Sequence, residues 1–211
     1  MHLFDKEPIP ESLKMAYANA IRPAIRLLNK LDIHPNTFTA LGFLICAVSS
    51  YFMAVGRFRL AAVLVLLGGL CDTLDGNLAR DSGKVTRFGA LFDSTLDRYS
   101  EVLLFFGMAY HFIERDMLLA SVATAVALGG SMMVSYVRAK AESLGFECKV
   151  GVLQRPERLL LICAGGLIHP NALIAAVCVI AVLSNFTAVV RILHVWKEDQ
   201  RVPASSVPPK P

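Results

Sequence analysis

Apolar residues gather in six stretches along the chain, with short polar or charged connections between them. Two stretches, 37–56 and 117–137, contain no charged residue and are long enough to cross a bilayer as helices. A third, 172–190, is nearly as long. This pattern predicts an all-α integral membrane protein.

The other three apolar stretches, 60–71, 102–113 and 159–168, are too short to span a membrane by themselves. Each reaches spanning length only if its helix also includes the charged segment beside it. Those segments bring in Asp72 and Asp75, then Asp93, Asp97, Arg98 and Glu101, and finally Arg155, Glu157 and Arg158. We therefore expect six transmembrane helices.

Basic residues are divided unequally between the two ends of these expected helices. The connections at one end hold Arg57, Arg59 and Arg115, and the other 18 of the 21 Lys and Arg fall at the opposite end. The cytoplasmic side of a membrane protein carries the excess of Lys and Arg. We therefore expect the N-terminus and all three charged half-helices at the cytosolic face of the cytoplasmic membrane.

Polar segments flank the expected membrane domain, which covers residues 35–198. Within residues 1–34, the segment 11–31 alternates apolar and basic positions at helical period. That pattern is typical of an amphipathic helix lying in the membrane interface, or equally of an ordinary helix packed on a core. The Pro- and Ser-rich residues 199–211 are predicted to form a disordered cytoplasmic tail.

Composition narrows the classes of partner. The chain is 55% hydrophobic and its net charge is a modest +4. On a membrane protein this charge favours anionic lipid headgroups or a phosphorylated substrate over nucleic acid. The five cysteines have no spacing typical of a metal site, so we interpret them as free thiols.

Four aspartates stand at helical spacing within two of the charged half-helices. Asp72 and Asp75 are three residues apart, and Asp93 and Asp97 are four apart, so each pair shares one helix face. A short turn joins the two helices, which predicts antiparallel neighbours with converging carboxylates. Unpaired carboxylates are unfavourable at membrane depth. We expect them to hold two divalent ions, and carboxylate oxygens favour Mg²⁺ or Mn²⁺ over zinc.

The residues around these aspartates carry a family signature. The sequence DTLDGNLAR at 72–80, followed by Gly89, Asp93 and Asp97, fits D-x2-D-G-x2-A-R-x8-G-x3-D-x3-D at every fixed position. This segment resembles the CDP-alcohol phosphotransferases, and PNTFT at 35–39 extends the resemblance. The resemblance implies transfer of the phosphatidyl group of CDP-diacylglycerol, or a similar CDP-lipid, to an alcohol. CMP is released, as in phospholipid biosynthesis.

The resemblance also implies roles for individual residues. Asp72, Asp75, Asp93 and Asp97 would hold the two ions, with Asp93 and Asp97 catalytic and Asp97 the general base. The CDP-lipid would be bound by Pro35, Asn36, Thr39, Asp72, Gly76, Ala79, Arg80 and Gly89. A homodimer is also implied.

A second polar segment, 135–158, lies between the fourth and fifth apolar stretches and is rich in basic residues. A basic cluster beyond a metal-neutralised pyrophosphate predicts an acceptor that bears its own phosphate. The candidate acceptor-phosphate ligands are Ser135, Arg138, Lys140, Arg155, Arg158 and Arg191. We expect a cytosol-facing cavity between the second, third, fourth and fifth helices.

The blocks SYVRAKAESLG at 135–145 and RPER at 155–158 resemble the phosphatidylinositol-phosphate and archaetidylinositol-phosphate synthases. The resemblance implies inositol 1-phosphate as the acceptor, and glycerol 3-phosphate remains an alternative because it too carries a phosphate. Two other classes remain open. A proton-coupled transporter also places charges at membrane depth, but nearer the midplane. A membrane interaction subunit would scatter paired charges along its helices.

Overall fold

The structure is a computed structural model that describes residues 25, 28 and 33–201. Between residues 33 and 201 the chain is all-α and forms six helices. They are α2 (Pro35–Ala54), α3 (Phe58–Asp81), α4 (Arg87–Glu114), α5 (Leu118–Ser143), α6 (Arg155–Ile168) and α7 (Pro170–Asp199). The predicted interfacial helix 11–31 and the predicted tail 199–211 lie largely outside the described residues.

The charged segments are helical, as their spacing predicted. Asp72 and Asp75 lie on α3, Asp93 and Asp97 lie on α4, and Arg155 is the first residue of α6. Local caps fix where these helices begin. Thr86 accepts a hydrogen bond from the Gly89 amide at the start of α4. Gln154 and Glu157 form a capping box at the start of α6.

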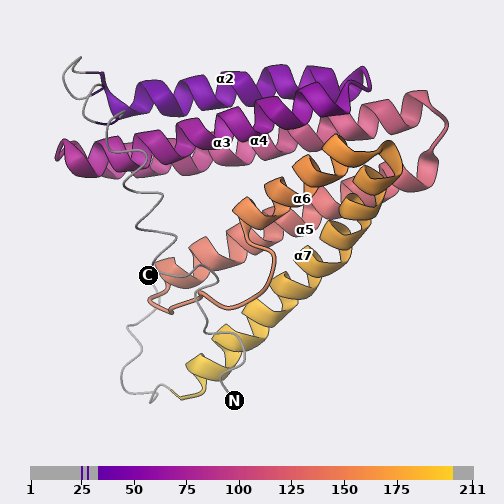
Figure 1. Ribbon diagram of the computed structural model, residues 1–211. Coiled ribbons are helices and arrows are strands. Elements are labelled where there is room, and N and C mark those ends of the chain that lie inside the picture. Colours follow the sequence, from indigo (N-terminus) through magenta and orange to yellow (C-terminus); the bar gives the residue numbers. More distant parts are fainter. Residues whose placement is uncertain (1–24, 26–27, 29–32, 202–211) are drawn as a thin grey trace.

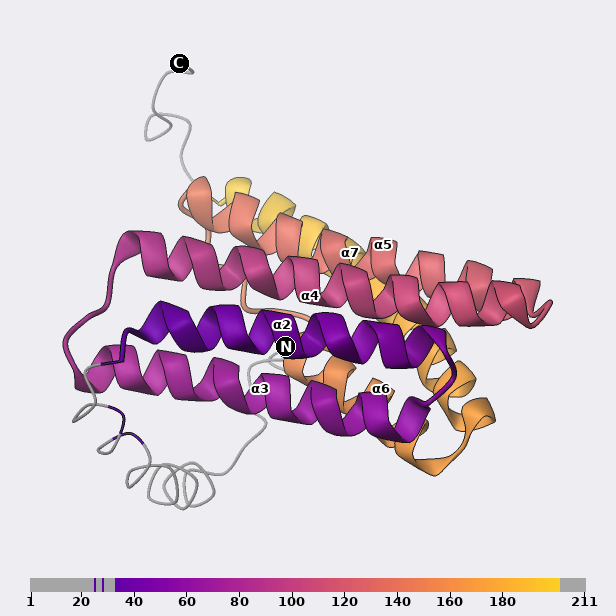
Figure 2. The ribbon, with the colours of Figure 1, turned by 90° about the horizontal axis from the view of Figure 1, so that it is seen from above.

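The helices form two groups. In Figure 1, α2, α3 and α4 make one layer; α5 and α6 lie below it, and α7 packs on these two helices. Helix α2 packs against both α3 and α4, α5 packs against α4 and α7, and α6 packs against α3 and α7. Seen from above, α2 lies over the gap between α3 and α4 (Figure 2), on their upper side in Figure 1. As expected, α3 and α4 approach each other through the carboxylates of Asp72, Asp93 and Asp97, but each helix packs mainly against α2 rather than against the other.

Apolar side chains fill the space between the layers and also cover the outside. The core includes Phe105, Met108, Phe112, Ile162, Leu173 and Ile180. Large apolar side chains point outward as well, among them Leu44, Phe106 and Val182, and each is more than half exposed. By length and composition, α2, α5 and α7 are suited to cross a membrane. These features indicate an integral membrane protein.

Candidate active site

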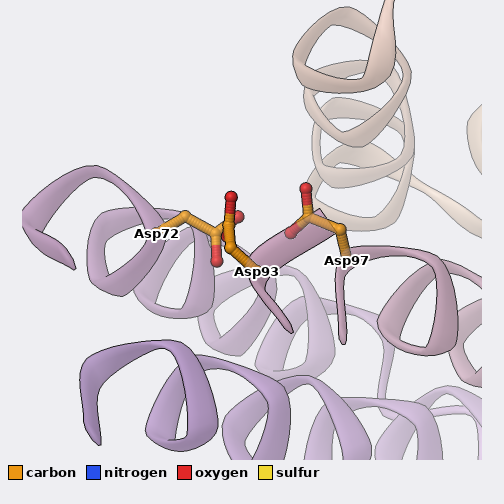
Figure 3. Close-up of side chains that lie close together, drawn as sticks. All are labelled: Asp72, Asp93 and Asp97. Carbon is orange, nitrogen blue, oxygen red and sulfur yellow. The ribbon is translucent and has the colours of Figure 1, made fainter. Parts of the chain in front are cut away.

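Three of the predicted aspartates meet between α3 and α4, on the side that faces α6. Asp72 on α3 and Asp93 and Asp97 on α4 each offer a carboxylate oxygen, and these oxygens all lie within 4.8 Å of one another (Figure 3). All three residues are partly buried. A group of hard oxygen donors at this separation suits a divalent cation such as Mg²⁺ or Mn²⁺. We call Asp72, Asp93 and Asp97 the aspartate triad.

Asp75 lies outside the triad and is the most buried of the four aspartates. It is 5% exposed, and its Oδ2 accepts a hydrogen bond of 2.6 Å from the Thr39 hydroxyl on α2. Asp75 nevertheless lines the same cavity as Asp93. Thr39 therefore orients the carboxylate of Asp75 beside the triad and joins α2 to α3 at the site.

Close packing of α2 on α3 places Asp72. A Cβ atom at Gly42 would lie 3.3 Å from the Gly68 carbonyl oxygen and 3.4 Å from Asp72 Oδ1. A Cβ atom at Gly68 would lie 2.7 Å from Cys46 Sγ. These two glycines let the helix backbones approach next to the triad. Neither was predicted from the sequence as part of the site, because their role depends on which helices meet.

A cavity of about 320 Å³ opens between α2, α3 and the start of α4. We call it the first cavity. Its lining includes every residue predicted to bind the CDP-lipid except Asp72, namely Pro35, Asn36, Thr39, Gly76, Ala79, Arg80 and Gly89. A side chain at Gly89 would collide with Thr86 Oγ1, at 2.9 Å, so this wall of the cavity needs glycine.

A larger cavity of about 770 Å³ lies on the other side of the triad, between α4, α5, α6 and α7. We call it the second cavity. Of the predicted acceptor-phosphate residues, Ser135, Arg138, Arg155, Arg158 and Arg191 line it. Lys140 is exposed and lies outside its lining. The single cavity predicted from the sequence is thus replaced by two, and α2 and α7 also contribute walls.

Arg155 joins the second cavity to the triad. Its guanidinium bonds Asp72 Oδ2 at 2.7 Å and Asp97 Oδ1 at 2.6 Å. The side chain is 17% exposed, and its Nε is buried without a hydrogen-bond partner. The sequence predicted Arg155 as a ligand of the acceptor phosphate but gave no sign of its contact with the aspartates.

Two of the other predicted phosphate ligands are engaged with the protein itself. Arg158 is fully buried and forms a bidentate ion pair with Glu101, at 2.7 and 3.1 Å. Arg191 is 2% exposed and donates to the carbonyl oxygens of Val150 and Val134. In this arrangement both guanidiniums hold the wall of the second cavity together.

Arg98 is a cavity residue that the sequence analysis did not assign to the site. It follows Asp97 on α4, lines the second cavity and contacts the Ser135 hydroxyl through Nη1. Its Nη2 lies 3.6 Å from Asp97 Oδ2. The sequence feature that could have predicted this position is that Arg98 lies in the same charged half-helix as Asp97.

The triad lies where the two cavities meet. Asp93 lines the first cavity, while Asp97 and Arg155 line the second. A molecule in one cavity and a molecule in the other would therefore both approach the same carboxylates. This arrangement suits transfer of a phosphorus-centred group between two substrates that bind on opposite sides of a metal centre.

Comparisons with known proteins find one matching family and several related proteins. The family described as CDP-alcohol phosphatidyltransferase matches residues 32–204. The chain is 38% identical over 188 residues to the archaetidylinositol phosphate synthase of Methanothermobacter thermautotrophicus, covering 85% of this chain and 94% of that protein. It is 31% identical over 214 residues to the phosphatidylinositol phosphate synthase of Mycobacterium tuberculosis, covering 96% of this chain and 97% of that protein.

Solved structures of the mycobacterial protein share the fold. The crystal structure with CDP-DAG bound superposes with a TM-score of 0.79 at 31% identity, covering 90% of this chain and 98% of that one. The complex with manganese and citrate gives a TM-score of 0.78 at 30% identity, with coverage of 89% and 92%.

Proposed function

Because the chain belongs to the CDP-alcohol phosphatidyltransferase family, we propose that it transfers the phosphatidyl group of CDP-diacylglycerol, or of a similar CDP-lipid, to inositol 1-phosphate. The products are phosphatidylinositol phosphate, or its counterpart with other lipid tails, and CMP. The observation that carries this proposal is the position of the aspartate triad between the first cavity and the basic second cavity.

The first cavity would take the nucleotide end of the donor. Gly76, Ala79 and Gly89 present little side chain there, which allows a flat base or a phosphate to approach the backbone. Arg80 also lines this cavity, and its guanidinium can hydrogen-bond a phosphate oxygen. The relative from M. tuberculosis, solved with CDP-DAG bound, supports a CDP-lipid as the donor.

Asp72, Asp93 and Asp97, together with Asp75, would hold two Mg²⁺ or Mn²⁺ ions. Such ions neutralise the charge of a pyrophosphate and orient the reacting oxygens. The relative solved with manganese supports a divalent cation in this family. The carboxylates of this chain fix where that charge is placed, and Thr39 holds the carboxylate of Asp75.

The acceptor would enter the second cavity and turn one hydroxyl towards the triad. Asp97 lines this cavity and can take the hydroxyl proton on a carboxylate oxygen as the new P–O bond forms. The bond from phosphorus to the CMP oxygen breaks in the same displacement, and CMP leaves with the electron pair. The chain thereby supplies both the base and the alignment of the two substrates.

The phosphate of the acceptor would be bound by Ser135, Arg138 and Arg155. These side chains line the second cavity and are only partly buried, unlike Arg158 and Arg191. A bidentate guanidinium matches the geometry of a phosphate. The names of the relatives, archaetidylinositol phosphate and phosphatidylinositol phosphate synthases, support inositol phosphate over glycerol 3-phosphate.

The proposal includes the placement in the membrane. The six helices would lie in the cytoplasmic membrane with the active site at the cytosolic face. Helix α6 has only 14 residues, about 21 Å, and would therefore cross only part of the apolar layer, contrary to the expectation of six full spans. The exposed apolar side chains of α5 and α7 could serve contact with lipid or with the second copy of a homodimer.

One assay tests the reaction and its acceptor together. Purified protein is given CDP-diacylglycerol, Mg²⁺ or Mn²⁺, and labelled inositol 1-phosphate, glycerol 3-phosphate or inositol in separate reactions. We expect labelled lipid and CMP with inositol 1-phosphate, and neither from the variant Asp93→Asn. Product from glycerol 3-phosphate alone would identify a phosphatidylglycerophosphate synthase, and no CMP with any acceptor would contradict the proposed function.

A further inference from the structure

Two consecutive ion pairs connect α4 to α6. Asp97 and Glu101 are four residues apart on α4, and Arg155 and Arg158 are three apart on α6, so each pair shares one helix face. Asp97 bonds Arg155 at 2.6 Å, and Glu101 bonds Arg158 at 2.7 Å. The first pair borders the second cavity, and the second pair lies one helical turn deeper.

The deeper pair is almost fully buried. The side chains of Glu101 and Arg158 are each 1% exposed. Nε and Nη2 of Arg158 bond the two oxygens of Glu101, at 2.7 and 3.1 Å. Removing one partner of such a pair leaves an uncompensated charge, whereas the intact pair adds little net stability over apolar residues. A buried pair is therefore explained better by the geometry it imposes than by the stability it adds.

Arg158 also bonds the backbone just before α6. Its Nη1 donates to the carbonyl oxygen of Leu153 at 3.0 Å. Leu153 has a φ of +62°, a left-handed conformation that a branched residue seldom adopts without support. The Gln154 amide donates to Glu157 Oε2 at 2.8 Å and closes the first turn. Glu101 thus fixes the bend from which Arg155 projects.

Arg155 itself has few other restraints. Its guanidinium is bonded to Asp72 and Asp97, and its Nε is buried without a partner. The place it occupies between the triad and the second cavity therefore depends on where the first turn of α6 is held. A small rotation of that turn would move the guanidinium away from both.

We propose that Glu101 is a positioning residue, which acts through Arg158 to hold Arg155 at the border between the aspartate triad and the second cavity. The proposal rests on the proposed function, because it assigns Glu101 to the binding of the acceptor phosphate. The hydrogen bonds of Glu101 are to Arg158, not to the triad, and Glu101 does not line the first cavity. Its loss should therefore affect the acceptor more than the CDP-lipid.

A double-mutant cycle tests whether Glu101 acts through Arg155. The variants are Glu101→Gln, Arg155→Ala and the double variant, and Glu114→Gln at the far end of α4 is the matched control. We expect Glu101→Gln to raise KM for inositol 1-phosphate about tenfold, a size typical of coupled contacts, with little change in KM for CDP-diacylglycerol. In the Arg155→Ala background the same change should leave the acceptor KM within about twofold.

A general structural role predicts a different pattern. An increase in acceptor KM of the same factor in both backgrounds would overturn the proposal, as would equal increases in both Michaelis constants. If Glu101→Gln does not fold, Glu101→Asp keeps the charge with a shorter side chain and should show the same dependence on Arg155.

A readout without substrate separates this inference from the proposed function. The midpoints of thermal unfolding are measured for the same variants. If Glu101 positions Arg155, the shift in the double variant will be smaller than the sum of the single shifts, because Glu101→Gln already weakens the Arg155 ion pairs. Additive shifts would overturn the inference whether or not the protein turns over any acceptor. A failure to turn over any acceptor would, by itself, contradict only the proposed function.

Discussion

A single hydrogen bond from Thr39 distinguishes Asp75 from the other three aspartates. The other three aspartates face one another, but Asp75 turns towards the Thr39 hydroxyl at 2.6 Å. A buried carboxylate that accepts one short hydrogen bond has lost much of its rotational freedom. The second oxygen of Asp75 can then be offered in a fixed direction along the first cavity.

Replacing Thr39 by valine should therefore impair use of the CDP-lipid. The substitution keeps the shape of the side chain and leaves buried Asp75 without its hydrogen bond. We expect kcat/KM for CDP-diacylglycerol to fall roughly tenfold, in line with the loss of one buried hydrogen bond to a charged group. Thr39→Ser retains the hydroxyl and should keep most of the activity. Equal activity of the two variants would contradict this role.

Arg155 and a divalent cation would use the same carboxylates, since Arg155 bonds one oxygen of Asp72 and one of Asp97. Removing the guanidinium should tighten the binding of Mn²⁺ to the substrate-free protein. We expect Arg155→Ala to lower the Kd for Mn²⁺ about fivefold, measured from the free-ion signal in electron paramagnetic resonance. Arg138→Ala is the control, because Arg138 bonds Glu142 and should leave the Kd unchanged. Weaker binding in Arg155→Ala would contradict the shared use of these oxygens.

The residues of the site differ in how far the sequence could predict them. Helical spacing and the family signature identified the four aspartates and the lining of the first cavity. The partners of Asp75, Arg155 and Arg158 could not be predicted, because each lies 36 or more positions away and depends on how helices pack. Lys140 shares the basic segment but faces outside the second cavity, a distinction that charge alone does not make.

At the scale of the helices, close packing between α2 and α3 sets the position of Asp72. A Cβ atom at Gly68 would meet Cys46 Sγ at 2.7 Å, whereas one at Gly69 would meet nothing within 4 Å. Of these two neighbouring glycines, only Gly68 is needed for close approach of another helix. Gly68 allows α2 to approach, and Gly69 faces open space.

A pair of alanine substitutions tests this difference. Gly68→Ala should push α2 from α3, lower the free energy of unfolding by roughly 1–3 kcal/mol and reduce CMP release. Gly69→Ala should leave CMP release intact and the free energy of unfolding unchanged or slightly higher, because alanine is the better helix former. Thermal unfolding and CMP release are measured for both variants. A comparable loss in Gly69→Ala would show that helix flexibility, rather than close packing, is what the glycines supply.

Which helices pack against one another was less predictable than where each helix begins and ends. The short turn at 82–86 implied antiparallel α3 and α4, and their charged halves are helical as expected. Nothing in the length of that turn indicates whether α3 and α4 pack on each other or on a third helix. Helix α2 packs closely on α3 because small residues such as Gly42 and Ser49 face it.

At the scale of the whole molecule, the distribution of basic residues predicts which ends of the helices face the cytosol. The connection after α4 contains Arg115 and should face outward, and the end of α5 contains exposed Ser143 and should face inward. We expect a membrane-impermeant maleimide to label Arg115→Cys but not Ser143→Cys in intact cells. Both should be labelled after the membrane is opened. The reverse pattern in intact cells would contradict the proposed orientation.

The first cavity has a consequence for which lipids the protein can use. Phe88 and Leu91, on the same helical turn as Gly89, are each 64% exposed, so apolar surface lies near the place where the nucleotide would be held, although neither residue lines the cavity. A donor gripped by its cytidine and phosphates would leave its tails among the surrounding lipids. Recognition would then stop at the headgroup, and ester-linked and ether-linked chains would serve equally well.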